Sequence, residues 1–278
     1  MTCCADLHIH TTASDGTYRP DNIVAAAIAA SLSTISITDH DTMDGYLDAI
    51  RILTGELTVI PGIEFSTDLP WHEVHILGYH IDPHHIKLQT VLQTLADDRS
   101  SRTARIVSKL HQLGYPVSLD LVHELAGTAS VLGRPHVARA LVASGYATSV
   151  KDAFQRLLDK NGPAYVPHYK LTPGEVVNLI HRSGGLAVLA HPGLIGDDTL
   201  VQELLDLGMD GIEAIHPAHS QLQISQYEQL AESRRLLVTG GSDFHGLPGR
   251  FPESLGLFTV PQILADSLSE AARRPGMK

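Results

Sequence analysis

The chain has 278 residues, of which 43% are hydrophobic and 18% charged, a composition typical of a globular protein with a sizeable core. The formal net charge of −11 argues against a protein that coats nucleic acid through a broad basic surface. It leaves a phosphorylated substrate open, because bound divalent metals would concentrate positive charge at one spot. The unusual number is 17 histidines, the commonest metal ligand.

No apolar run reaches the roughly 18–20 residues needed to span a bilayer, so we expect no membrane segment. The first residues show neither the basic region nor the apolar region of a secretory signal. Cys3 and Cys4 are adjacent and therefore poorly placed to cross-link a fold. A reducing, cytoplasmic setting is the expectation.

In chain order, the first ninety residues alternate short apolar runs with helical stretches. A helix is predicted over 21–31, where Asp21 follows Pro20 and can cap the first turn. Strands are predicted by their apolar and β-branched runs. They cover 6–10, 34–38, 58–60 and 73–81.

From about residue 84 to residue 163 the strand-like runs disappear and charged helical patterns replace them. Helices are predicted over 88–113, 119–126, 135–144 and 150–160. We interpret 84–163 as a helical insert that serves as a lid or substrate-recognition unit, with 1–83 and 164–278 forming the main domain. Gly162-Pro163 marks one edge of the insert.

The strand-helix alternation returns after residue 164. Strands are predicted over 186–190, 211–215, 236–239 and 256–260, with helices over 173–183, 199–207 and 221–234. Repeated units of this kind indicate an α/β protein with a parallel sheet or barrel, whose chemistry lies at the ends of the strands.

Histidines and acidic residues gather at those predicted strand ends. The set comprises His8, His10, Asp15, His40, Glu64, His75, His191, Asp243 and His245. His8 and His10 are two residues apart, so on a strand both point to one face. Imidazole and carboxylate suit Zn, Mn, Fe and similar cations, and a carboxylate can bridge two of them. Any one of these residues alone is better explained as a surface, capping or core group; their recurrence at successive strand ends indicates a metal centre.

The remaining histidines fall into two groups. Seven lie in helical or loop contexts with no companion acid, and we interpret them as surface or structural groups: His72, His80, His84, His85, His111, His123 and His181. Four could line a pocket without binding metal: His136, His168, His216 and His219.

The motifs DLHIHTTASDG, ITDHD, PGIEFS, HILGY, AHPG and GGSDFHG run from residue 6 to residue 246 and together resemble the PHP (polymerase and histidinol phosphatase) family. The closest resemblance is to the branch of nucleoside 3′,5′-bisphosphate phosphatases and 5′-to-3′ exoribonucleases, which carries a helical insert after HILGY. The resemblance implies a distorted (β/α)7 barrel with a trinuclear site, and every ligand position of the motif is filled.

Carried over by motif, the resemblance implies three divalent ions, with Mn as first choice and Zn or Fe as alternatives. The first would be held by His8, His10, Glu64 and Asp243, the second by Glu64, His75 and His191, and the third by Asp15, His40 and His245. The implied mechanism is in-line attack on phosphorus by a metal-bridging hydroxide, with Glu64, Asp15 and His245 central to it. No general acid is evident; His216 is one candidate and a metal-bound water another.

Three arginines in the predicted insert are candidates for binding substrate phosphate: Arg99, Arg102 and Arg134. Spacing alone favours a helix face paired with Asp97 and Asp98, but the resemblance places substrate-binding arginines at these stretches. Arg99 and Arg102, three apart, could share one face. Lys170 and Arg250 have no assigned role.

The leading hypothesis is a metal-dependent phosphomonoesterase acting on a small nucleotide such as a nucleoside 3′,5′-bisphosphate. Alternatives are a 5′-to-3′ exoribonuclease on short RNA, a histidinol-phosphate phosphatase and a metal-binding regulatory module without catalysis. The acidic balance favours a short substrate over a long polymer, since few basic residues remain to follow a backbone. No protein partner is evident, and the sequence leaves the oligomeric state open.

Overall fold

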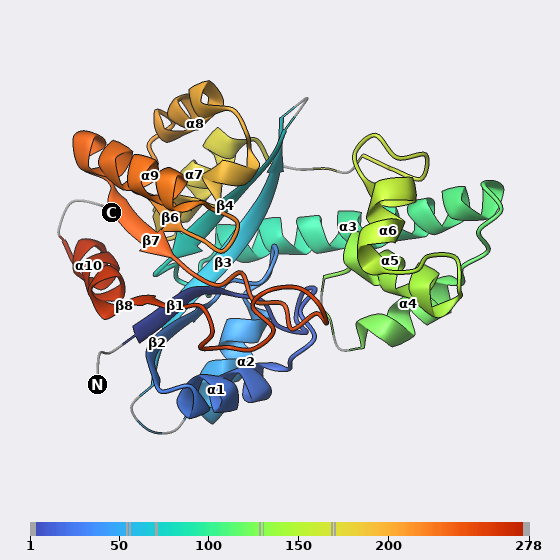
Figure 1. The fold of residues 1–278 in the computed structure, drawn as a ribbon, viewed down its shortest axis with the longest axis horizontal. Coiled ribbons are helices and arrows are strands. Elements are labelled where there is room, and N and C mark those ends of the chain that lie inside the picture. The colour runs from blue at the N-terminus through green and yellow to red at the C-terminus, as the bar shows by residue number, and fades with distance from the viewer. Residues whose placement is uncertain are drawn as a thin grey trace.

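A computed structural model describes residues 4–53, 55, 57–69, 72–127, 129, 131–167, 169 and 171–274 of the chain. A curled sheet with helices around it lies beside a smaller group of helices, and one long helix joins the two (Figure 1). The strands are β1 (Cys4–Ile9), β2 (Leu32–Ile37), β3 (Thr58–Asp68), β4 (Glu73–Tyr79), β5 (Leu186–Leu189), β6 (Gly211–Ile215), β7 (Leu237–Gly240) and β8 (Val260–Pro261).

Helices connect most of these strands. They are α1 (Pro20–Ala29), α2 (Asp44–Ile52), α3 (Ile86–Gln112), α4 (Leu119–Ala126), α5 (Arg134–Ala143), α6 (Val150–Ala153), the π-helix η1 (Phe154–Leu158), α7 (Pro173–Arg182), the 3-10 helix η2 (Pro192–Leu194), α8 (Asp198–Leu205), α9 (Gln221–Arg234) and α10 (Gln262–Ala272). Local chemistry fixes some boundaries: α7 begins at a capping box in which Thr172 and Glu175 bond reciprocally. In the part of the chain that the structure describes, no helix is both long and apolar enough to cross a membrane.

The strands form one sheet in the order β7-β6-β5-β4-β3-β2-β1-β8. β1 to β3 are parallel, as are β5 to β7, while β4 runs antiparallel between β3 and β5. The sheet curls until β1 and β7 meet, because Ile9 at the end of β1 bridges Phe244 after β7, and the Ser242 N–H donates to Asp6 Oδ1 at 2.9 Å. The predicted α/β barrel of seven strands is confirmed, and the two-residue β8 adds to β1 beyond it.

Some predicted elements differ from the structure. A strand over 256–260 is wrong, since only Val260–Pro261 pair, and Gly256 has a φ of +87°, which a strand cannot accommodate. The strand predicted over 58–60 continues through Pro61 to Asp68 and turns back directly into β4. This hairpin needs no crossover helix, which is why β4 is antiparallel in an otherwise parallel barrel. Helices α2 and α10 have no counterpart in the prediction.

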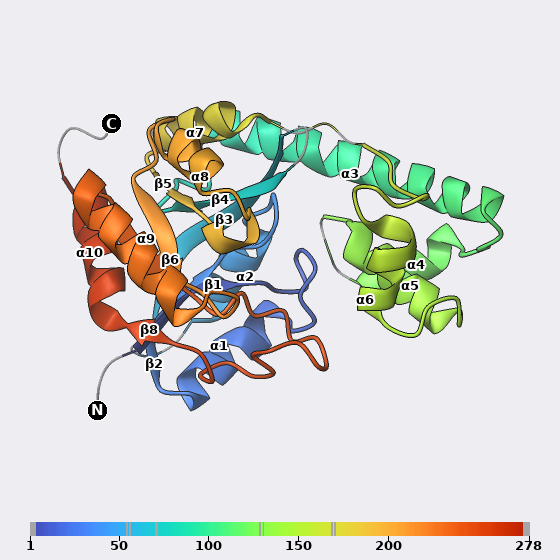
Figure 2. The ribbon, with the colours of Figure 1, turned by 45° about the horizontal axis from the view of Figure 1, so that its top comes forward.

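The helices between β4 and α7 form a lobe with its own apolar cluster. The first half of α3 packs Leu88 and Leu95 into the barrel cluster, whereas its second half contributes Ile106 and Leu110 to a cluster with α4, α5 and η1. Figure 2 shows α3 extending from the barrel to this lobe, with α5 on the side that faces the sheet. One helix is therefore shared by both units.

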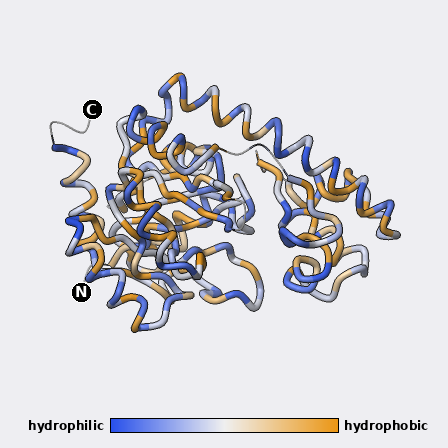
Figure 3. Tube along the Cα trace, turned by 90° about the horizontal axis from the view of Figure 1, so that it is seen from above, coloured by the Kyte–Doolittle hydropathy of each residue, from blue (hydrophilic) through white to orange (hydrophobic). Residues whose placement is uncertain are grey.

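Apolar alternation explains how β1 presents its polar side chains. Ala5, Leu7 and Ile9 alternate with Asp6 and His8, and all five are fully buried. Burying each large apolar side chain contributes about 1.5–3 kcal/mol, which offsets the cost of placing the polar ones inside. Figure 3 shows the same division across the molecule, with hydrophobic strands inside and hydrophilic segments on the outer helices. The polar face of β1 contributes the first residue of the candidate site, His8.

Candidate metal centre

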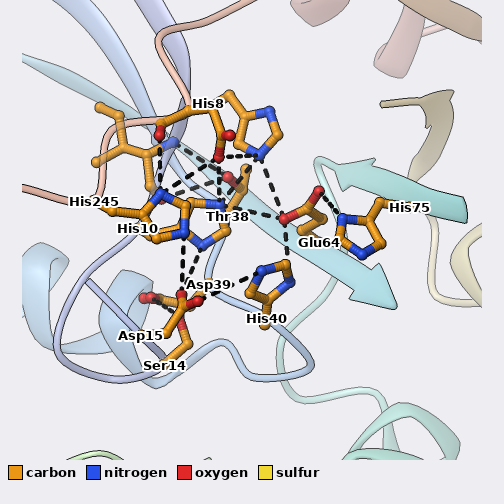
Figure 4. A network of polar contacts seen from close by, with 12 residues as sticks. His8, His10, Ser14, Asp15, Thr38, Asp39, His40, Glu64, His75 and His245 are labelled. Atoms are coloured by element: carbon orange, nitrogen blue, oxygen red, sulfur yellow. Dashed lines mark hydrogen bonds and ion pairs between the residues drawn. The ribbon is translucent and has the colours of Figure 1, made fainter. Parts of the chain in front are cut away.

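All nine residues predicted as metal ligands lie at one end of the barrel. Figure 4 shows seven of them, namely His8, His10, Asp15, His40, Glu64, His75 and His245. His8 comes from β1, His40 follows β2, and Glu64 comes from β3. His75 lies near the start of β4, and because β4 is antiparallel, its start lies at the same end of the barrel as the carboxyl ends of its neighbours. The remaining members come from the loops after β1, β5 and β7, namely His10, Asp15, His191, Asp243 and His245.

Glu64 lies at the middle of this group, and each of its oxygens faces different imidazoles. Oε1 is 2.9 Å from His75 Nδ1 and 3.0 Å from His191 Nε2. Oε2 is 3.1 Å from His40 Nδ1, 3.2 Å from His10 Nε2 and 3.4 Å from His8 Nε2. A carboxylate in this arrangement can bind one cation through each oxygen.

The other two carboxylates complete the cluster on either side of His10. Asp243 Oδ1 lies 3.2 Å from His10 Nε2 and 3.6 Å from His8 Nε2. Asp15 Oδ1 lies 3.3 Å from His245 Nε2, and its Oδ2 is 3.9 Å from His40 Nε2. The His10 ring therefore stands between two acids and stacks on the His245 ring with centroids 4.1 Å apart.

The donor set fits divalent cations. His8 Nε2 and His10 Nε2 face each other at 3.2 Å, and His10 Nδ1 is buried without a hydrogen-bond partner. Two imidazole lone pairs and two carboxylate oxygens that converge on one point are the ligands of a metal ion. Ligand atoms lie mutually close in three groups: His10, Asp15, His40 and His245; His8, His10 and Asp243; and His40, Glu64 and His75.

Three arginines of the helical lobe face this cluster across a cleft of about 570 Å³. Its lining includes Asp15, His40, His75, Arg99, Arg102 and Arg134. Instead of pairing with Asp97 or Asp98, Arg99 binds Asp41 and donates to Ser66 Oγ at 2.9 Å. On the same helix, Arg105 is the arginine that pairs with Asp98, at 3.6 Å.

The other two arginines also line the cleft, and each bonds within the protein, with Arg134 donating to the Leu158 carbonyl at 3.4 Å as well as to Glu73. Arg102 uses Nε for the Val166 carbonyl at 2.7 Å, which leaves its two amino groups at the cleft lining. Arg134 pairs with Glu73, a partly exposed carboxylate, at 2.8 Å. Burial first, and then repulsion from Arg134 and Arg99, lowers the pKa of Arg102 to about 10. Such a concentration of cations favours an anion between them.

A sequence profile of the PHP domain matches residues 6–162, more than half of the chain. The chain belongs to the PHP family.

Named relatives of this PHP protein cover most of its length. The 5′-3′ exoribonuclease Rnm of Escherichia coli is 36% identical over 248 residues, 86% of this chain and 84% of that protein. The phosphoribosyl 1,2-cyclic phosphate 1,2-diphosphodiesterase of Eggerthella lenta is 32% identical over 252 residues, 89% of this chain and 96% of that protein. The 3′,5′-nucleoside bisphosphate phosphatase of Chromobacterium violaceum is 30% identical over 257 residues, 90% of each.

A solved structure agrees in fold as well as sequence. A protein from Bifidobacterium adolescentis, described as a candidate metal-dependent phosphoesterase, superposes with a TM-score of 0.85 at 30% identity, over 95% of this chain and 94% of that one. The family, the relatives and the ligand groups agree, so this PHP protein is a metal-dependent phosphoesterase.

Charge in the PHP centre is balanced by protons on imidazole. Burial alone would raise the pKa of Glu64, but the facing histidines hold it well below its usual value, and the same opposition lowers the pKa of Asp15 and Asp243. Burial likewise opposes protonation of His10, yet Asp243 and Glu64 raise its pKa to about 10. Cations bound by these groups would replace those protons, so metal binding and proton release are coupled.

Two acids that support the PHP ligands have no assigned role in the sequence prediction. Glu213, fully buried in β6, accepts from His8 Nδ1 at 2.9 Å through one oxygen and from the His191 N–H at 2.8 Å through the other. Asp39 accepts from the Thr11 N–H at 2.7 Å and holds the loop that carries Asp15. The available signal was an acid inside the apolar run GIEAI, because a buried carboxylate needs partners.

Most of the remaining histidines bond elsewhere. His85 accepts from the Leu88 N–H at the start of α3, His181 binds Asp210 at 2.8 Å, and His80 bonds Ser269 at 3.2 Å. Within the described ranges, the seven histidines expected to be structural join none of the three ligand groups.

Of the four histidines expected near a pocket, His136 lines the cleft and accepts from the Gly133 N–H. His219 donates to the Ala214 carbonyl at 2.8 Å and accepts from the Gly193 N–H at 3.1 Å. Arg250, which had no assigned role, pairs with Asp243. His168, Lys170 and Cys3 lie outside the described residues.

Proposed function

We propose that the nine residues hold three divalent ions, with Mn the preferred metal, in the three ligand sets that the family resemblance implies. The group of His8, His10 and Asp243 supports the first set, and the group of Asp15, His40 and His245 supports the third. For the second, His75 and His191 both face Glu64 Oε1 within 3.0 Å. His40 also lies 3.1 Å from Glu64 Oε2, so it could be exchanged between the second and third ions.

The chain's own residues prepare phosphoester cleavage by orientation and charge. Bound divalent ions lower the pKa of water and stabilise charge on a phosphoryl group. Glu64 would offer its oxygens to neighbouring ions, and Asp15, which faces His245 at 3.3 Å, would hold the end of the cluster that Arg139 of α5 contacts. Glu213 holds the His8 ring, and Asp39 holds the loop that carries Asp15. These side chains therefore need little movement when substrate binds.

We infer that the substrate is a small nucleotide with a second phosphate, such as a nucleoside 3′,5′-bisphosphate. The observation that carries this proposal is the position of Arg102 and Arg134 across the cleft from the metal ligands. A phosphoester held at the metals leaves a second phosphate facing these arginines, which bind phosphate through two parallel N–H groups. Arg99 forms an ion pair with Asp41, so we assign it the role of shaping the cleft and positioning Arg102, three residues further along the helix.

Residues 84–163 are proposed as the recognition unit. Helix α5 supplies three of its side chains: Arg134 begins the helix, His136 lines the cleft, and Arg139 donates to the Asp15 carbonyl at 3.0 Å. The lobe thus contacts the loop of a predicted ligand.

A second candidate is 5′-to-3′ exonuclease activity on short RNA, favoured by the 36% identity to the E. coli exoribonuclease. The test is phosphate or nucleotide release with Mn from adenosine 3′,5′-bisphosphate, AMP, histidinol phosphate and a short 5′-phosphorylated oligoribonucleotide. We expect the bisphosphate to have the highest kcat/KM. Preference for the oligonucleotide would contradict the small-substrate proposal, and no release by the metal-loaded protein would contradict both.

Arginine variants test the second-phosphate subsite. Arg102→Gln is expected to raise KM for the bisphosphate about 10- to 100-fold, because a charge-assisted hydrogen bond contributes about 1.5–3 kcal/mol. Its effect on a phosphomonoester without a second phosphate should be small. Arg105→Gln on the same helix is the matched control, since Arg105 is exposed and pairs with Asp98. Equal KM changes for both substrates would contradict the subsite.

Metal analysis tests the centre itself. Protein purified without chelator should carry two to three equivalents, and less than one would contradict the ligand assignment. Glu64→Ala should lose activity and metal together, because Glu64 faces five of the imidazoles.

A further inference from the structure

His216 stands beside the metal centre with a buried ring nitrogen that makes no hydrogen bond within the protein. It follows β6, and its side chain is buried, with 4% exposure. Its ring packs between those of His191 and His219, with centroids 5.4 and 5.3 Å away. Nε2 is buried and has no hydrogen-bond partner. A buried polar atom without a partner is costly unless a ligand supplies one.

Its other nitrogen fixes which proton the ring carries. Nδ1 lies 3.1 Å from the Ala218 N–H, which can only donate, so Nδ1 accepts. A neutral imidazole that accepts at one nitrogen carries its hydrogen on the other. The orphan Nε2 is therefore a donor, and it cannot offer a lone pair to a metal in this tautomer.

The Nε2–H of His216 points toward the ligand cluster but makes no hydrogen bond with it. The nearest acceptor is Asp243 Oδ2 at 3.6 Å, beyond hydrogen-bond reach. Arg250 already donates to that same oxygen. His8 lies on the other side, with its ring centroid 6.3 Å away. An N–H in this position faces the space between Asp243 and the histidines of the first ligand group.

We propose that His216 is a catalytic residue that donates its Nε2–H to an oxygen of the bound phosphoryl group. The inference rests on the proposed phosphoester cleavage at this centre. A neutral imidazole N–H binds an anionic oxygen without giving up its proton, and it stabilises charge that grows on that oxygen. His216 then acts on the phosphoryl group at the ligand cluster, while the arginines of the cleft address the second phosphate.

The experiment separates donor, metal ligand and packing. Titration calorimetry would measure binding of inorganic phosphate to the metal-loaded, full-length protein. His216→Asn can still accept from Ala218 but does not reach with a donor, so phosphate affinity should fall about 10- to 100-fold. His216→Gln places an amide N–H near the lost Nε2–H and should restore most of the affinity. His84→Asn, the same exchange at an exposed position, is the control.

Two further readouts keep the outcomes distinct. Metal content should be unchanged in both variants; loss of an equivalent would overturn the proposal in favour of a ligand role. In ¹⁵N-histidine NMR of the Zn-loaded chain, the signal absent from His216→Asn should show the Nε2–H tautomer and shift with phosphate. The Nδ1–H tautomer, or unchanged phosphate affinity in His216→Asn, would also overturn it. Neither readout depends on which nucleotide the enzyme prefers, so failure of the bisphosphate proposal would be recognised separately.

Discussion

Glu213→Gln tests whether a buried acid that binds no metal itself determines metal affinity. The carboxylate accepts at 2.9 Å from His8 Nδ1 and at 2.8 Å from the His191 N–H. Burial opposes its ionisation, yet His8 lowers the pKa of Glu213 below its ordinary value, so it is a charged acceptor for both donors. It fixes His8 with Nε2 directed at the cluster.

The magnitude follows from the two contacts. An amide has one acceptor oxygen, so the Gln side chain can serve one donor while its NH₂ group faces the other. At least one charge-assisted bond of about 1.5–3 kcal/mol is lost, and one buried N–H is left unsatisfied. A partner that orients a metal-bound imidazole typically changes metal affinity about 10- to 100-fold, which is about 1.4–2.8 kcal/mol.

Competition titration with a colorimetric chelator would measure the affinity, and metal analysis the stoichiometry. We expect the variant to bind its weakest metal about 10- to 100-fold less tightly and to lose activity in proportion, with recovery at high metal concentration. Glu228→Gln on the exposed face of α9 is the matched control. Unchanged affinity in Glu213→Gln would refute the idea that this acid orients His8.

Four other perturbations have expected outcomes. Burial and the neighbouring Arg139 lower the pKa of His136 to about 4, so below its ordinary pKa of about 6.5 this histidine is protonated in the unfolded chain before it is protonated in the folded one. The free energy of unfolding should therefore fall by about 2 kcal/mol between pH 7.5 and pH 5. In urea unfolding, His136→Asn should remove that part of the pH dependence. Gly241→Ala would place a Cβ 2.4 Å from the His8 backbone nitrogen and should cost about 1–3 kcal/mol or more in the same assay. By contrast, Gly174→Ala meets nothing within 4 Å in a helix and should be neutral or slightly stabilising. Chelation should lower the melting temperature, because each site saturated at 100 times its Kd stabilises the fold by about 2.7 kcal/mol; an unchanged melting temperature would contradict metal binding to the folded state.

Sequence patterns predict those features that depend on residues close together in the chain. The alternation in Asp6–His10 predicts two imidazoles on one face, and that face is the one that meets Glu64 and Asp243. The strand-helix order predicts the barrel, since parallel strands joined by helices have few other ways to bury both faces. The capping box of Thr172 and Glu175 is likewise a local signal, which marks the start of α7.

Other features depend on contacts between distant segments. The strand predicted over 256–260 satisfied local propensity, but a positive φ at Gly256 and exposure of Leu257 leave this segment as a loop. Helix spacing offers Asp97 and Asp98 as partners of Arg99, but the fold pairs Arg99 with Asp41, 58 residues away in the chain. Charge and spacing name the possible partners of an arginine, but only packing selects one of them.

By itself, the sequence determined the fold class and the family and predicted the nine-residue set, because those depend on residue types at the ends of successive strands. Tertiary structure decided how that set is arranged: Glu64 divides its oxygens between imidazoles, and Glu213 supports His8 across 205 residues of chain. It also left Nε2 of His216 buried without a partner. Hydrogen bonds act over about 3 Å in directions that the folded backbone sets, and no linear spacing encodes those directions.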